Sequence, residues 1–222
     1  MVASNLLDTH LEALEASGKG LKTMTRVCVI GKLSAGASGS GFSSWCQKSL
    51  APSGDSVTGL LLLLPDGFVH TLEGPQADIP PFLQSLHLCD QLAECRIISS
   101  QEDVRSAYFP HWTSAEANVQ RSNYAEIDED GVPGLLADTA IGMMKIGKKF
   151  TADRSSPQAA ASLVAHWDQH FAEFMPSNER LGQLFELEGL PTLGDFLDIY
   201  ETPVDVAMEG DQIWPPEHPQ VY

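Results

Sequence analysis

The sequence lacks the features that direct a chain into or across a membrane. No run approaches the ~18 consecutive apolar residues of a membrane-spanning helix. Its N-terminal segment carries Asp8, Glu12 and Glu15, where a secretory signal peptide has a basic start and an apolar stretch. These absences predict a cytoplasmic protein without a membrane partner.

Basic residues are scarce as well. Thirteen Lys and Arg stand against thirty Asp and Glu, which gives a net charge of −17 and repels nucleic acids and anionic lipids. The segment 181–222 holds nine acids and no Lys or Arg, which is typical of a surface for a basic partner or of a solvated acidic end. Lys145, Lys148 and Lys149 are a basic exception, and we interpret them as a partner for this tail or as a docking site.

Cysteine spacing gives no sign of a zinc site or a disulfide framework. The four cysteines form no C-x-x-C pair, and Cys28 lies inside an apolar, strand-like run. We therefore expect free thiols in a reducing compartment. The composition, 43% hydrophobic and 19% charged, is that of a folded globular chain.

Motifs of catalysis and cofactor binding are also missing. The Gly/Ser-rich loop at 34–41 has neither of the glycine spacings that cradle phosphates. His166 and His170 stand four apart without the glutamate of an H-E-x-x-H motif, so surface histidines are the simpler interpretation of this pair. Glu73 has no titratable partner nearby in sequence, which favours a turn or cap role. We expect a protein that is not an enzyme and holds no metal.

The remaining pattern predicts an α+β domain. Strand-like segments alternate with two helical segments in the order βαββαββ, typical of a ferredoxin-like sheet with both helices on one face. The unbroken leucines of "GLLLLL" predict a strand buried on both faces. The expected strands are 25–33, 56–64, 67–74, 93–104 and 106–112, with Pro110 marking the last as an edge, and the expected helices are 42–50 and 78–89, the second capped by Asp78.

The flanking segments differ from this domain. We predict a short amphipathic helix at 4–16, helices at 156–175, 177–189 and 190–200, the last with a Thr192 cap, and an extended strap at 211–222. The expected organisation is an N-terminal helical arm at 1–24, the α+β domain at 25–114, and a helical extension with an acidic extended strap at 115–222.

One stretch resembles a known family. The string "VTGLLLLLPDGFVHTLEGP", a helix, "CRIISS" and "VRSAYFPHW" together resemble the BLUF domain, the blue-light sensor that uses flavin. In that family a tyrosine, an asparagine and a glutamine bond the flavin, and these fall here at Val29 (or Gly31 in a shifted register), Pro52 and His70. Trp112 alone matches. The resemblance implies a degenerate BLUF domain without cofactor, in which His70 occupies a filled, vestigial pocket or bonds a different ligand.

A second resemblance concerns the distal half. The strings "GLPTLGDFLDIYETPVDV" and "IWPP" resemble a testis-expressed, BLUF-like group associated with cilia and sperm flagella. This implies a non-enzymatic structural component of an axonemal assembly, with the central apparatus as a candidate position and other axonemal proteins as partners. The expected partner-binding residues are Asp205, Glu209, Asp211, Trp214, Pro215 and Pro216.

Two alternatives stay open. One is a flavin-binding blue-light sensor or regulator, which the strand pattern and Trp112 favour. The other is an acylphosphatase-like enzyme on the same fold, for which the expected Arg-bearing phosphate loop is not visible.

Overall fold

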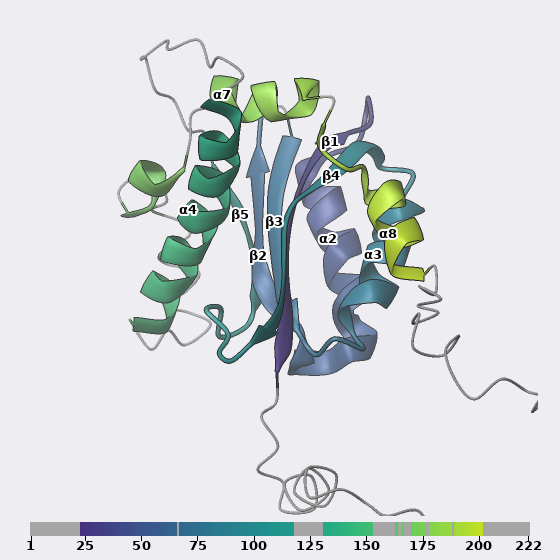
Figure 1. Cartoon of the computed structure of the whole chain (residues 1–222), viewed down its shortest axis with the longest axis vertical. Coiled ribbons are helices and arrows are strands. Elements are labelled where there is room, and N and C mark those ends of the chain that lie inside the picture. Colours follow the sequence, from purple (N-terminus) through teal and green to yellow (C-terminus); the bar gives the residue numbers. More distant parts are fainter. Residues whose placement is uncertain are drawn as a thin grey trace, which may run out of the picture.

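Five strands pair into one sheet in a computed structural model of the chain (Figure 1). The structure describes residues 23–65, 67–117, 131–152, 163, 166, 170–175, 178–187 and 189–201. Strand order is β4-β1-β3-β2-β5, antiparallel except for the parallel pair of β2 and β5. The strands are β1 Met24–Leu33, β2 Thr58–Leu64, β3 Gly67–Gly74, β4 Leu92–Val104 and β5 Trp112–Glu116.

Helices cover both faces of this sheet, so the molecule has three layers (Figure 1). One face carries α2, α3 and α8, and the other carries α4, α7 and the short turns beside them. The helices are α2 Gly39–Leu50, α3 Ile79–His87, α4 Val132–Ala152, α7 Asn178–Gln183 and α8 Leu193–Glu201, with 3-10 turns η1 Ala51–Ser56, η3 Ala172–Phe174 and η4 Leu184–Glu186.

The predicted ferredoxin-like order is confirmed, with α2 and α3 together on one face. The leucine run of β2 is buried on both sides, as its lack of alternation predicts. Leu61 and Leu63 pack toward α2 and α3, whereas Leu60 and Leu62 pack toward α4. The sheet therefore has a hydrophobic core on each face.

Two local predictions were wrong. The last strand begins at Trp112, after Pro110, because the backbone of 106–111 turns instead of pairing; β5 is nevertheless an edge strand. Asp78 precedes α3 but makes no capping hydrogen bond, because its carboxylate instead accepts a hydrogen bond from the Ser56 hydroxyl at 2.6 Å.

The first helix begins three residues earlier than the sequence predicts. Ser38 is its N-cap, and its hydroxyl accepts a hydrogen bond from the Gly41 N–H at 3.1 Å. The Gly/Ser-rich loop thus supplies a helix start.

The long helix α4 was not predicted. It buries one side against the sheet through Leu135, Met143, Ile146 and Phe150. Gly142 lies where the helix meets the Phe174 carbonyl, and a Cβ there would collide with that oxygen. Three glycines and two β-branched threonines give the segment a low intrinsic helix propensity, so packing on the sheet stabilises it.

The segment that ends in α8 closes the β4 edge of the sheet. The Ile97 N–H donates to the Pro191 carbonyl at 3.2 Å, and the Arg96 guanidinium donates to the Leu187 and Leu190 carbonyls at 2.7 and 3.0 Å. The predicted Thr192 cap is confirmed: Thr192 and Asp195 exchange side-chain and backbone hydrogen bonds. Covering an edge in this way blocks unwanted strand pairing.

Several predictions fall outside the described residues. These are the helix at 4–16, most of the helix at 156–175, the strap at 211–222 and the six partner-binding residues of the tail. In the part that the structure describes, no helix has the length and hydropathy to cross a bilayer.

Two glycines of α4 provide a matched test of this packing. We expect Gly142→Ala to lower the free energy of unfolding by about 1–3 kcal/mol, because the new methyl group meets the Phe174 backbone. Gly134→Ala, whose Cβ meets nothing within 4 Å, should instead stabilise by up to about 1 kcal/mol. Urea unfolding of both variants measures this; equal effects at the two sites would contradict the close approach.

Candidate functional site

The strand positions that the resemblance assigns to a cofactor pocket meet in the middle of the sheet. Val29 of β1 and His70 of β3 are register partners, and His70 also pairs with Leu61 of β2. Val29 and His70 are fully buried and face the layer of α2 and α3. The structure thus brings two of the four predicted positions side by side.

Trp112, the third position, reaches His70 from β5. Its indole Nε1–H donates to His70 Nε2 at 3.0 Å. Since Nε2 accepts, the neutral imidazole carries its proton on Nδ1. That N–H is buried and has no hydrogen-bond partner among the described residues.

Aromatic side chains pack around this pair. The Phe82 ring of α3 meets the His70 ring edge-on at 5.7 Å, and the Trp112 ring meets it at 6.1 Å. Phe42 of α2 packs on Phe68 at 4.8 Å between ring centroids in the same core. Protein side chains surround His70 at the position where the resemblance places a flavin contact.

Burial controls the ionisation of His70. Desolvation lowers the pKa of its imidazole from 6.5 to about 3. His70 is therefore neutral at physiological pH, which suits it to accept the Trp112 hydrogen bond.

This pKa shift predicts a pH-dependent stability. Because the folded-state pKa is depressed, the unfolded chain binds a proton as pH falls below about 6.5, and stability is lost progressively toward pH 3. Between pH 7 and pH 5 this loss amounts to about 2 kcal/mol. Urea unfolding at the two pH values should show it in the wild type and in His87→Gln, an exposed control, but not in His70→Gln. A pH dependence that survives in His70→Gln would contradict the assignment.

Pro52, the fourth predicted position, does not join this group. It is exposed and lies at the start of η1. Beside η1 is an open groove of about 630 Å³, floored in part by Trp112. Its polar lining residues include Gln47, Asp55 and His111.

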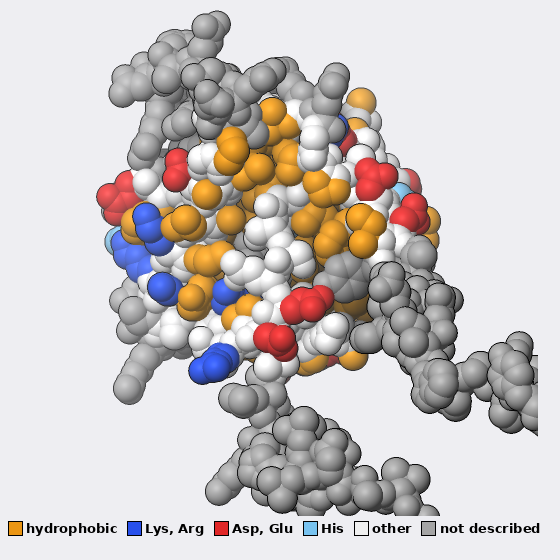
Figure 2. Space-filling view, viewed as in Figure 1, with side chains coloured by type: hydrophobic (Ala, Val, Ile, Leu, Met, Phe, Trp, Pro, Cys, Tyr) orange, Lys and Arg blue, Asp and Glu red, His pale blue; other side chains and the backbone are white. Residues whose placement is uncertain are grey.

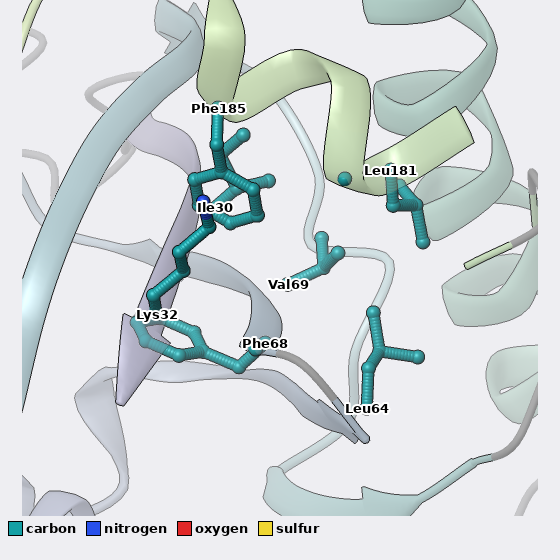
Figure 3. Close-up of a pocket in the computed structure, with 9 residues that line it drawn as sticks. Ile30, Lys32, Leu64, Phe68, Val69, Leu181 and Phe185 are labelled. Atoms are coloured by element: carbon teal, nitrogen blue, oxygen red, sulfur yellow. The ribbon is translucent and has the colours of Figure 1, made fainter. Parts of the chain in front are cut away.

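A second hollow lies under α7 and η4 at the other end of the sheet (Figure 3). Leu181 and Phe185 face Ile30, Phe68 and Val69 across it, and its volume is about 30 Å³. A space of this size holds about one water molecule, and an apolar lining favours an empty space. We interpret it as a packing gap.

Glu73 lies next to the last residue of β3 and forms a buried ion pair with Arg26. Its Oε1 accepts from the Arg26 Nε at 2.5 Å, and both side chains are almost fully buried. Its Oε2 accepts from the backbone N–H groups of Tyr108 and Phe109 at 2.7 and 3.0 Å. Glu73 was predicted to have a turn or cap role. In the structure it holds the backbone of the connection between β4 and β5.

Removing the charge of Glu73 should therefore be costly. In Glu73→Gln the Arg26 guanidinium stays buried without its counter-charge, and we expect the free energy of unfolding to fall by about 3–5 kcal/mol. Glu94→Gln, in the partly exposed pair with Arg96, should cost about 1 kcal/mol or less. Denaturant titration compares the two, and equal losses would contradict a special role for the buried pair.

The lysines of α4 and the histidine pair are the remaining candidates from the sequence. Lys149 donates to the His170 carbonyl at 3.0 Å, and Lys148 lies over the Tyr108 ring. Among the described residues, which include His166 and His170, no group of three His, Cys, Asp or Glu side chains could hold a metal ion.

The thiols are free, as their spacing predicts. Burial raises the pKa of Cys28 and of Cys95 to about 12 and also raises that of Cys46 and Cys89. Thiols in this state are poor nucleophiles, since the thiolate is the reactive form.

Most of the chain matches one known protein family. A family model described as testis-expressed protein 47 matches residues 24–202, which include the sheet and all described helices. The chain belongs to the testis-expressed protein 47 family. The testis-expressed relationship predicted from the distal strings is thereby confirmed. No curated protein matches the sequence.

Solved structures similar to this member of the testis-expressed protein 47 family include BLUF proteins. BlrB, a BLUF protein in its dark state, has a TM-score of 0.37 at 16% identity, covering 65% of this chain and 95% of its own. BlsA in its photo-activated state has a TM-score of 0.37 at 11% identity, covering 64% and 93%. A bacterial light-regulated adenylyl cyclase has a TM-score of 0.40 at 20% identity over 64% of this chain, which spans 39% of the cyclase.

Proposed function

We propose that this protein is a non-enzymatic interaction component of a ciliary or flagellar axoneme, in which a BLUF-like sheet without flavin serves as a rigid docking scaffold. The observation that carries the proposal is the packing around His70. A ring system that bound there would have to displace Phe82 or the Trp112 hydrogen bond. In this proposal the protein's own side chains fill that place.

The positions assigned to the flavin contacts support the same proposal. Val29 has no phenol, and Pro52 has no side-chain amide and is exposed at the start of η1. Each missing hydrogen bond to a buried polar ligand costs about 1–3 kcal/mol, so their joint loss lowers flavin affinity severely. This weakens the alternative, a flavin-binding sensor.

An axonemal location is proposed from the family and from the tail. Expression in testis is what the family's description states, and sperm flagella are built there. The acidic, proline-containing tail with Asp205, Glu209, Asp211, Trp214, Pro215 and Pro216 suits contact with other axonemal proteins. We place the protein in the cytoplasmic space of the cilium or flagellum, bound to the axonemal cytoskeleton.

Detergent extraction of flagellated cells that express the tagged full chain tests this proposal. We expect the chain to stay with the axoneme after the membrane and soluble proteins are removed. A variant with Trp214→Ala and Asp211→Asn should be released, while its circular dichroism stays unchanged. Complete release of the wild type by detergent alone would contradict the axonemal role.

A further inference from the structure

Three lysines lie close together on the second half of α4. Lys145, Lys148 and Lys149 are spaced i, i+3 and i+4, which places them on one side of the helix. Asp138 is the one acidic residue of α4. Figure 2 shows Lys and Arg side chains gathered on the side of the molecule that α4 occupies. A concentrated positive surface is unusual in a chain with a net charge of −17.

Tyr108 fixes one part of this surface. Two cations lie over its ring, the Arg26 guanidinium 4.0 Å from the ring centroid and the Lys148 ammonium at 5.0 Å. Its backbone is held at both ends, since the N–H donates to Glu73 and the carbonyl accepts from Thr151. Lys148 therefore lies over an aromatic ring that cannot move easily.

Lys149 is fixed in a different way, and Lys145 is open to solvent. The Lys149 ammonium donates to the His170 carbonyl at 3.0 Å and lies 5.4 Å from the Phe171 ring centroid. Lys145 is exposed one turn earlier on the helix. Holding two of three cations in place lowers the entropy that a ligand must overcome to order them.

We propose that this surface, the lysine platform of Lys145, Lys148, Lys149 and Tyr108, binds an acidic peptide segment of a partner protein. The inference rests on the proposed function and gives its docking scaffold a specific contact. A short acidic segment suits the platform because the cations extend over little more than one helical turn. A long polyanion such as a nucleic acid would be repelled by the rest of the chain, which has thirty acidic residues and a net charge of −17.

The arrangement of the layers favours a partner over the protein's own acidic tail. The tail leaves the fold after α8, which packs with α2 and α3 on one face of the sheet. The lysine platform lies on the opposite face, with α4 (Figure 1). To reach it, the tail would have to pass around an edge of the sheet.

Fluorescence anisotropy of a labelled, glutamate-rich peptide, titrated with the full chain at low salt, tests the proposal. We expect saturable binding that weakens as salt is added. Lys145→Glu should weaken it roughly tenfold, and adding Lys148→Glu should abolish it. The matched control is Lys48→Glu, an exposed helical lysine on the other face, which should change the affinity by less than about twofold.

Three results would overturn the proposal. Equal losses in Lys145→Glu and Lys48→Glu would mean that the peptide responds to net charge and not to a site. A tenfold gain in the full chain carrying Asp205→Asn, Glu209→Gln and Asp211→Asn would identify the tail as the occupant. Equal competition by an oligonucleotide of the same length would assign the surface to nucleic acid.

The failure of this inference can be told apart from that of the proposed function. Retention of Lys145→Glu/Lys148→Glu on the axoneme, with no peptide binding by the wild type, would remove the lysine platform alone. Release of the wild type from the axoneme, with peptide binding intact, would remove the axonemal role alone.

Discussion

The buried ion pair between Arg26 and Glu73 links the centre of the sheet to the segment that precedes β5. It joins neighbouring strands at the centre of the sheet and is almost fully buried, so each charge depends on the other for solvation. The second oxygen of Glu73 holds the backbone of Tyr108 and Phe109. Phe109 in turn lies against Gly147 of α4. The Glu73 carboxylate thus positions the connection from β4 to β5, and through Phe109 it positions the surface on which α4 packs.

The two faces of the sheet follow from this arrangement and have different uses. On the α2 and α3 face, His70 and Trp112 form a polar contact inside an aromatic core. On the α4 face, the Tyr108 ring contacts both the buried Arg26 guanidinium and the exposed Lys148 ammonium. The α2 and α3 face thus buries a neutral polar pair, whereas the α4 face carries an exposed cation over an aromatic ring.

The sequence predicted the sheet well because its signals are local. The leucine run, the adjoining strands at 56–64 and 67–74 and the Thr192 cap each depend on neighbouring residues and were confirmed in place. The start of β5 was misplaced because Tyr108 and Phe109 are held by Glu73, a contact between residues 35 and 36 positions apart. No local pattern contains such information.

The helix α4 and the partners of His70 illustrate the same limit. Leu135, Met143, Ile146 and Phe150 do recur at helical spacing, and this signal could have revealed α4, but glycines interrupt the segment. The resemblance singled out His70 and Trp112 together, whereas the hydrogen bond between them and the seal by Phe82 required the fold. Pro52 was assigned through the same resemblance, and the structure places it exposed at the start of η1.

An absorbance spectrum of the purified protein shows whether its own side chains fill the place of a flavin. The full chain would be purified in the dark from cells with ample flavin, and its released small molecules identified. We expect a colourless protein without the flavin band at about 450 nm. A stoichiometric flavin would contradict it, since His70 would then bond a cofactor where the structure has Phe82 and Trp112 around it.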